Sequence, residues 1–409
     1  MATEFRDEML DEILQGARTQ EELFGPQGIV NRLTAAVIQR ALQAELSFHL
    51  ESEKQQVGKG CQNRRNGSTT KTVQSSTGPL QLQVPRDREG TFEPQMVAKH
   101  QRRLRGFDNH VLALYARGMS VRQIQQHLEE IYGTQVSPEL ISRVTDAVYE
   151  EVQQWQSRPL DSRYAVLWLD ALCVKTRAQG AVQSQPTYVV MGLGMDGIRQ
   201  VLGLWMGESG EGAKFWMRVL SELRTRGVQD VLVCCCDGLS GFAAAIEAVF
   251  AKSVVQTCIV HQVRQSLSYV SHKDRQAVAD AMRAIYSAES EETALMALDK
   301  LDQTWSKRYP TIAASWRRRW SELSPFLAYP AEFRKMVYTT NAIESLHYRL
   351  RKLIKTKGHF PSAQAAMKVL YLALRDIDAR RKNPMPGWKQ IYNQLIILFG
   401  QERVEGTRF

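Results

Sequence analysis

The sequence predicts a mixed α/β protein whose core is a five-stranded sheet with flanking helices. Two apolar, β-rich runs indicate central strands, residues 164–174 and 231–236. A turn signal at Asp196–Gly197 lies between them and predicts antiparallel strands around it. Strand and helix patterns then alternate, which is typical of α/β folds.

The expected strands are, in chain order, 164–175, 188–192, 200–206, 231–236 and 254–260. An amphipathic helix follows the third strand and ends before Gly227. A second helix, residues 240–250, precedes the last strand. Three antiparallel strands, then helix, strand, helix and strand, is the order of an RNase H-like fold. In that fold the first and fourth strands are neighbours, so Asp170 and Asp237 are expected side by side.

Helices are expected after the sheet. Residues 160–262 form the first part of the core, residues 263–335 an α-helical insertion, and residues 336–409 the C-terminal helices of the core. One of these helices has a buried apolar stripe formed by Ile343, Leu346, Leu350, Leu353 and Ile354. Its adjacent polar face carries Glu344, Tyr348, Arg351 and Lys355.

Three segments precede the core. Residues 1–55 have helical spacing with a break at Gly25–Pro26, and residues 56–98 predict a small β element or arm with a turn at Gly78–Pro79. Residues 99–155 predict a helix-turn-helix DNA-binding domain, which would place its third helix in the major groove. An ordinary three-helix packing unit explains this last segment about as well.

Helix-start signals define the three helices of the 99–155 segment. Asp108 is expected to cap the first, Ser120 the second, and Ser137–Pro138 begins the third. Gly118 and Gly133 are expected to end the first two helices.

The net charge of +10 favours a polyanionic partner. Basic residues gather in three clusters, 99–105, 316–320 and 349–355, which suits a protein that follows a long phosphate backbone. Each cluster alone is equally explained by a solvated face. The candidate residues for binding double-stranded DNA are Arg102, Arg103, Arg105, Arg122, Arg143, Arg349, Arg351, Lys352 and Lys355.

Several other classes of protein are disfavoured. No apolar run is long enough for a transmembrane helix, and the polar N-terminus does not match a signal peptide. The six cysteines include no CxxC pair, and four of them lie in apolar runs, as expected for reduced thiols in the cytoplasm. The chain also lacks a GxxxxGK[ST] loop and a GxSxG elbow.

The chemistry is expected at Asp170, Asp237 and Glu344. Two aspartates at neighbouring strands plus a helical glutamate are the ligand set of two-metal phosphoryl transfer. The alternative is that one aspartate caps a helix and the other pairs with an arginine, while Glu344 forms a capping box with Asn341. Cys258 and His261 follow the fifth strand. Cys258 is interpreted mainly as a core residue, whereas His261 is as readily a strand-end polar residue as a supporting catalytic group.

The chain resembles the Mutator-type transposases of bacterial insertion sequences over nearly its full length. The resemblance rests on a set of short motifs: 63–67 (NRRNG), 84–94 (VPRDREGTFEP), 169–171 (LDA), Asp237–Gly238, Cys258-x-x-His261 and 339–345 (TTNAIES). It implies an RNase H-like core with an Asp170–Asp237–Glu344 triad and a helical insertion before the glutamate. It also implies that the Cys258-x-x-His261 pair lies next to the active site.

The resemblance further implies a cytoplasmic, nucleoid-associated enzyme that binds terminal inverted repeats as a homodimer or higher assembly. Its reactions would be Mg²⁺-dependent cleavage by water and strand transfer by the freed 3′-hydroxyl, with two Mg²⁺ ions that Mn²⁺ replaces. Two alternatives remain open. One is a DNA-binding regulator with an inactive catalytic domain, and the other is a structure-selective nuclease that cuts without joining.

Overall fold

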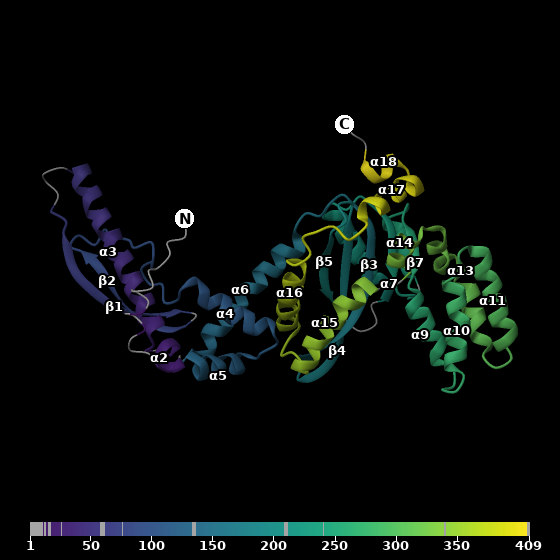
Figure 1. Cartoon of the computed structure of the whole chain (residues 1–409), viewed down its shortest axis with the longest axis horizontal. Coiled ribbons are helices and arrows are strands. Elements are labelled where there is room, and N and C mark those ends of the chain that lie inside the picture. The colour runs from purple at the N-terminus through teal and green to yellow at the C-terminus, as the bar shows by residue number, and fades with distance from the viewer. Residues whose placement is uncertain are drawn as a thin grey trace. The chain divides into compact units, whose positions relative to one another are not determined.

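The structure, a computed structural model, describes residues 11, 14, 18–25, 27–57, 62–75, 77–132, 136–207, 212–239, 241–338 and 341–406. Backbone contacts divide the chain into two compact units, Met1–Val148 and Tyr149–Phe409. Both are drawn in Figure 1, and each is described separately below. Among the described residues, no helix is both long and apolar enough to cross a membrane.

The first unit contains a long helix packed on a β-hairpin. Its elements are α2 (Gln20–Phe24), α3 (Ile29–Val57), β1 (Arg65–Ser75), β2 (Gly78–Asp87), α4 (Arg105–Ala116), α5 (Val121–Tyr132) and the start of α6 (Pro138–Ser157). Figure 1 shows α3 running along the hairpin. The two are joined by a small apolar core of Leu42, Val73, Leu80, Leu82 and Val97. The predicted β element is therefore confirmed, although both Gly78 and Pro79 belong to β2 and the turn precedes them.

The 99–155 segment contains three helices, and the second and third begin where their capping signals placed them. Ser120 Oγ accepts from the Gln123 amide at 3.3 Å, and Ser137 Oγ accepts from the Leu140 amide at 3.2 Å. The predicted Asp108 cap is wrong, because α4 begins at Arg105 and Asp108 instead pairs with Arg103 at 2.6 Å. Gly133 lies outside the described residues. The DNA-binding role of these helices stays a prediction.

The second unit is built on the predicted five-stranded sheet. Its elements are β3 (Arg163–Ala178), β4 (Ala181–Gly194), β5 (Arg199–Met206), α7 (Gly212–Thr225), β6 (Asp230–Cys236), α8 (Phe242–Val249) and β7 (Val254–Thr257). The strand order is β5-β4-β3-β6-β7, with β3–β4 and β4–β5 antiparallel and β3–β6 and β6–β7 parallel. The first and fourth strands are neighbours, and the arrangement is compatible with an RNase H-like core.

The predicted last strand is too long. The run from Val254 to Val260 contains the end of β7 at Thr257 and the start of helix α9 (Ile259–Ser268), with Cys258 as the N-cap. Buried strands and first helical turns both read as short apolar runs, so the sequence pattern could not separate them. The helix predicted to begin at Ser240 corresponds to α8, and Ser240 itself lies outside the described residues.

Helices cover the sheet and fill the predicted insertion. The insertion contains α9, α10 (Arg275–Tyr286), α11 (Glu291–Trp305), α12 (Pro310–Arg318), α13 (Trp320–Leu323), a 3₁₀ turn (Pro325–Ala328) and α14 (Ala331–Val337). They are followed by α15 (Asn341–Lys357), α16 (Ala363–Asp378), α17 (Trp388–Phe399) and α18 (Gln401–Glu405). In Figure 1 the insertion helices α10, α11 and α13 lie beyond the β7 edge of the sheet, and α16 lies near β5.

Side chains of the central strands alternate between two cores, as the two-residue period of a strand requires. Leu167 and Leu169 pack in one core beneath α7 and α8, and Trp168 packs in the other against the insertion helices. The Cys234–Cys236 run follows the same rule. Cys234 and Cys236 lie in the first core and Cys235 in the second. These three thiols are therefore free packing groups, and burial raises the pKa of Cys234 to about 12.

Gly197 lies in the predicted turn between β4 and β5, with a φ of 80°. A Cβ there would overlap the Trp388 ring, whereas Gly180 has a φ of 82° and open space around it. Gly180→Ala should therefore report backbone strain alone, about 1 kcal/mol, and Gly197→Ala should cost roughly 1–3 kcal/mol more. Urea unfolding followed by tryptophan fluorescence would measure the difference. Equal losses for the two variants would show that Trp388 does not fix this turn.

Candidate active site

The two aspartates meet at the centre of the sheet. In the parallel β3–β6 ladder Leu169 is paired with Cys236, so Asp170 and Asp237 occupy the next position on each strand path. Because side chains two residues apart on a strand share a face, Asp170 lies on the same face as Trp168 and Asp237 on the same face as Cys235. Trp168 and Cys235 belong to one core, so both aspartates face the same side of the sheet. This neighbourhood of Asp170 and Asp237 is the one predicted from the strand order.

Asp170 is buried but has partners for its charge. It is 5% exposed, and its Oδ1 accepts from the Ala171 amide at 2.8 Å. His347 of α15 places Nδ1 3.2 Å from Asp170 Oδ2. Burial alone would raise the pKa of this carboxyl, but His347, with a further contribution from His261, holds the pKa below its ordinary value. Asp170 is therefore an ionised carboxylate in an apolar setting.

The charge of Asp237 is compensated less fully. Burial, followed by repulsion from Asp170, raises the pKa of Asp237 to about 6. Its Oδ1 is buried and has no hydrogen-bond partner among the described residues. Two adjacent carboxylates, one with an orphaned oxygen, form a site that a divalent cation with oxygen ligands would satisfy. The residues present at the sheet, Asp170 and Asp237, therefore have the chemistry to hold Mg²⁺.

Two cationic side chains border Asp237. The guanidinium of Arg319 lies against Gly238, where any side chain would collide with it, and its positive charge lowers the pKa of Asp237. Arg319 also donates to Gln262 at 3.2 Å and lies 3.6 Å from Glu322. A side chain after Asp237 would therefore displace the guanidinium of an arginine from the insertion.

His261 is the second cation. It lies in the first turn of α9, where the Cys258 sulfur accepts from the His261 amide at 3.5 Å. A hydrogen bond with Cys258 raises the pKa of His261 to about 9, although burial opposes this shift. The negative charges of Asp170 and Asp237 raise it by smaller amounts. Cys258 is fully buried, as its interpretation as a core residue required. The prediction that His261 lies at a strand end is corrected, because the chain is already helical there.

Glu344, the third predicted ligand, forms an ion pair with an arginine. Its Oε1 is 3.1 Å from Arg264 Nη1 of α9. Among the described residues, no three acidic, histidine or cysteine side chains lie close enough to hold a metal together. His347, three residues later on α15, does reach Asp170. The structure therefore brings the two aspartates together, whereas Glu344 is paired with Arg264 one helical turn before His347.

Helix α15 otherwise matches its predicted faces. Ile343, Leu346 and Leu350 are fully buried, and Leu353 and Ile354 are half-buried. Tyr348, Arg351 and Lys355 on the polar face are exposed, as are Arg349 and Lys352. The predicted capping box lies outside the described residues, because the Asn341 side chain is among those not described.

The basic clusters differ in exposure. Arg102, Arg122 and Arg143 are exposed, Arg103 pairs with Asp108, and the Arg105 side chain is not described. In the 316–320 cluster, Trp316 is buried, and Arg317 pairs with Asp299 and Asp302. Arg318 is exposed and Arg319 lies against Gly238, so the middle cluster is only partly engaged in ion pairs.

The residues that sequence reasoning missed are His347, Arg264 and Arg319. His347 lies four residues after Ile343, so it shares the buried face of α15. A histidine at such a position could have indicated a buried polar contact. Arg264 and Arg319 carried no signal, because only the packing of the insertion against the sheet brings them to Glu344 and Asp237.

Comparisons with known proteins show the family of this chain. The family described as "Transposase, Mutator family" matches residues 5–383. The transposase for insertion sequence element ISRM3 of Rhizobium meliloti (strain 1021) is 48% identical over 96% of this chain and 98% of its own length. A probable transposase for an insertion sequence element of Corynebacterium diphtheriae is 43% identical over 77% of this chain and 98% of its own. The transposase for IS905 of Lactococcus lactis is 31% identical over 88% of this chain and 91% of its own. The chain belongs to the Mutator family of transposases.

Proposed function

We propose that this transposase binds the terminal inverted repeats of an insertion sequence and catalyses Mg²⁺-dependent DNA cleavage followed by strand transfer. The observation that carries the proposal is the pair of buried carboxylates on adjacent parallel strands, one with an unpartnered oxygen. When bound, two Mg²⁺ ions, or Mn²⁺ in their place, would activate the attacking oxygen and stabilise the leaving oxygen. Asp170, Asp237 and Glu344 are the residues that would hold them.

The chain's own side chains would orient the DNA strand at this centre. His261 and Arg319 are cationic groups beside Asp237, so they would attract the scissile phosphate. Exposed Arg351 and Lys355, on the polar face of α15, would neutralise flanking phosphates. Sequence recognition would come from the first unit, with Arg143 on α6 directed at the repeat. The active form would be a homodimer or higher assembly acting on chromosomal DNA in the cytoplasm.

Cleavage at a terminal repeat tests the proposal. A labelled duplex that spans the boundary between the insertion sequence and its flank is incubated with the purified chain and Mg²⁺, with EDTA as the control. Cleavage at the boundary, followed by joining of the freed end to a plasmid, supports transposition. Binding without metal-dependent cleavage would instead favour a regulator. Cleavage without boundary preference or joining would favour a structure-selective nuclease.

Glu344 has to exchange Arg264 for the metal site. Its Oε1 is 3.1 Å from Arg264, and no three ligands lie close enough to hold a metal among the described residues, so the ion pair is proposed to compete with metal binding. Arg264→Ala should therefore tighten Mn²⁺ binding by the DNA-free protein. Since exposed ion pairs contribute about 0.2–1 kcal/mol, the gain should not exceed about five-fold. Calorimetric titration with Mn²⁺ measures it, with Arg264→Lys as the variant that keeps the charge. Weaker Mn²⁺ binding by Arg264→Ala would contradict this account.

A further inference from the structure

We infer that the β1–β2 hairpin and the segment after it form a groove that binds duplex DNA, separately from the three helices that follow. The inference rests on the proposed DNA-binding function and assigns part of it to residues 66–102. It concerns the motifs 63–67 and 84–94, which the active site does not use.

The groove is an open concavity of about 840 Å³ within the first unit. Residues of β1, of β2 with the loop after it, and of the 97–102 segment line it. Its lining includes two acidic side chains, Asp87 and Glu89, and five lysines and arginines, namely Lys71, Arg86, Arg88, Lys99 and Arg102. Exposed threonines of β1, Thr69, Thr70 and Thr72, supply hydroxyl groups to the same surface.

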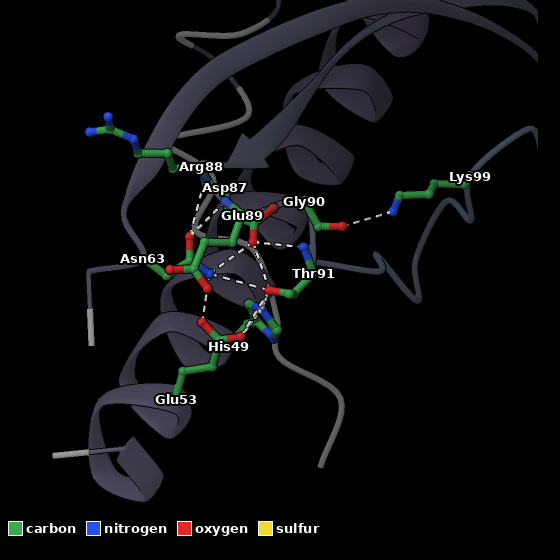
Figure 2. A network of polar contacts seen from close by, with 9 residues as sticks. All are labelled: His49, Glu53, Asn63, Asp87, Arg88, Glu89, Gly90, Thr91 and Lys99. Carbon is green, nitrogen blue, oxygen red and sulfur yellow. Dashed lines mark hydrogen bonds and ion pairs between the residues drawn. The ribbon is translucent and has the colours of Figure 1, made fainter. Parts of the chain in front are cut away.

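A buried polar network fixes one wall of the groove (Figure 2). The Asn63 amide nitrogen donates to Asp87 Oδ2 at 2.8 Å and to Glu53 Oε2 at 2.6 Å. The Asn63 amide oxygen accepts from the backbone amides of Arg88 and Glu89 at 3.1 and 3.2 Å. Asn63 and Asp87 are only 3% and 4% exposed, so a single side chain ties the helix, the strand and the loop together.

Thr91 closes the same network. Its hydroxyl donates to Glu53 Oε1 and contacts Asp87 Oδ2, both at 2.8 Å, and its amide donates to Asp87 at 2.9 Å. These bonds, led by the Asn63 donor, hold the pKa of Asp87 well below its ordinary value despite burial. Asp87 is therefore a structural carboxylate whose charge is engaged by hydrogen bonds, while Arg86 and Arg88 on either side of it are exposed. Figure 2 shows the Arg88 side chain pointing away from the network.

The opposite wall is also fixed. Lys71 Nζ donates to Ala98 O at 2.9 Å, and Lys99 Nζ donates to Gly90 O at 3.3 Å. The Gln74 amide donates to Arg102 O at 2.8 Å, which ties the segment to the edge of β1. His100 lies between these ties with a φ of 67°, a left-handed conformation that non-glycine residues seldom adopt. Because these contacts already hold the segment in place, ligand binding would cost little conformational entropy.

Duplex DNA suits this surface by charge. Exposed arginines and lysines on a rigid frame are suited to phosphate contacts, and hydroxyl groups of the threonines add hydrogen bonds to the backbone. A two-stranded antiparallel ribbon is also one of the two elements that the major groove of DNA admits. The motif residues thus divide into a buried frame, Asn63, Asp87 and Thr91, and the exposed arginines that it presents.

The test compares two double variants of the full chain that remove the same charge. Arg86→Ala with Arg88→Ala alters the groove, and Arg40→Ala with Lys54→Ala alters exposed residues of α3 that do not line it. The probe is a fluorescent duplex of the terminal repeat, followed by anisotropy at several salt concentrations. All four side chains are exposed, so thermal melting of both variants should match the wild type.

The groove variant should bind the duplex at least about ten-fold more weakly, since two charge-assisted contacts are lost. Its slope of log affinity against log salt should fall by about 1.8, roughly 0.9 for each phosphate contact. The α3 variant should keep the wild-type slope. If the wild type binds the repeat and the two variants behave alike, the groove inference is overturned and the proposed function stands. If the wild type fails to bind the repeat, both are overturned.

Discussion

Asp170→Asn and Asp237→Asn are each expected to slow Mg²⁺-dependent cleavage of the terminal repeat by on the order of a thousand-fold, because the metals contribute several kcal/mol to the reaction. Asparagine keeps the size of each side chain, so the fold and DNA binding should be retained. Quantified cleavage products under single-turnover conditions measure the rate. Asp376→Asn, an exposed carboxylate on α16, is the matched control and should cleave normally.

The outcome also separates the alternatives for the two aspartates. If one of them merely caps a helix or pairs with an arginine, its variant should lose stability and keep cleavage. Either aspartate variant cleaving at near the wild-type rate with Mg²⁺ would remove that residue from the metal site.

His347→Leu is expected to lower the Mn²⁺ affinity of the protein by about ten- to hundred-fold, the effect usual for a residue that orients a metal ligand. His347 is fully buried, and its Nδ1 lies 3.2 Å from Asp170 Oδ2. Without that partner Asp170 is buried against an apolar group, so both its charge and its orientation are less well maintained. His347 is thus a positioning residue that acts through Asp170.

Metal titration distinguishes this role from a purely structural one. His347→Asn places an amide nitrogen near the position of Nδ1, so it should recover part of the Mn²⁺ affinity lost in His347→Leu. Urea unfolding of both variants gives the stability change separately. Wild-type Mn²⁺ affinity in His347→Leu, whatever its stability, would show that the contact with Asp170 does not serve the metal site.

The sheet could be predicted because its signals are local. Apolar runs of β-rich residues, a turn at Asp196–Gly197 and Gly227 after a helix each report on a few neighbouring residues. The strand order followed from the sequence of elements, and with it the approach of Asp170 and Asp237. Helix starts at Ser120 and Ser137 were equally local, since a cap depends only on the next three residues.

Two predictions of element boundaries failed, each for its own reason. Asp108 has the right chemistry for a cap, but a neighbouring arginine, Arg103, binds it instead. The apolar run that ends β7 continues into α9, and Cys258 gave no signal of the change.

The partners of the active-site residues could not be predicted from local patterns. Arg264 and Glu344 are far apart in the sequence, and their contact depends on how α9 packs beside α15. The same holds for Arg319, which reaches Gly238 from the insertion. Sequence reasoning placed the carboxylates, and tertiary packing decided which cations they meet.

The central claim is that Asp170, Asp237 and Glu344 form one metal site for DNA strand transfer, and a joining reaction tests it most directly. A terminal repeat already carrying a free 3′-hydroxyl is mixed with a target plasmid, the chain and Mg²⁺. The wild type should join the two DNAs, while Glu344→Gln, which keeps the shape of the side chain, and a reaction with EDTA should not. Joining by Glu344→Gln at the wild-type rate would contradict the account.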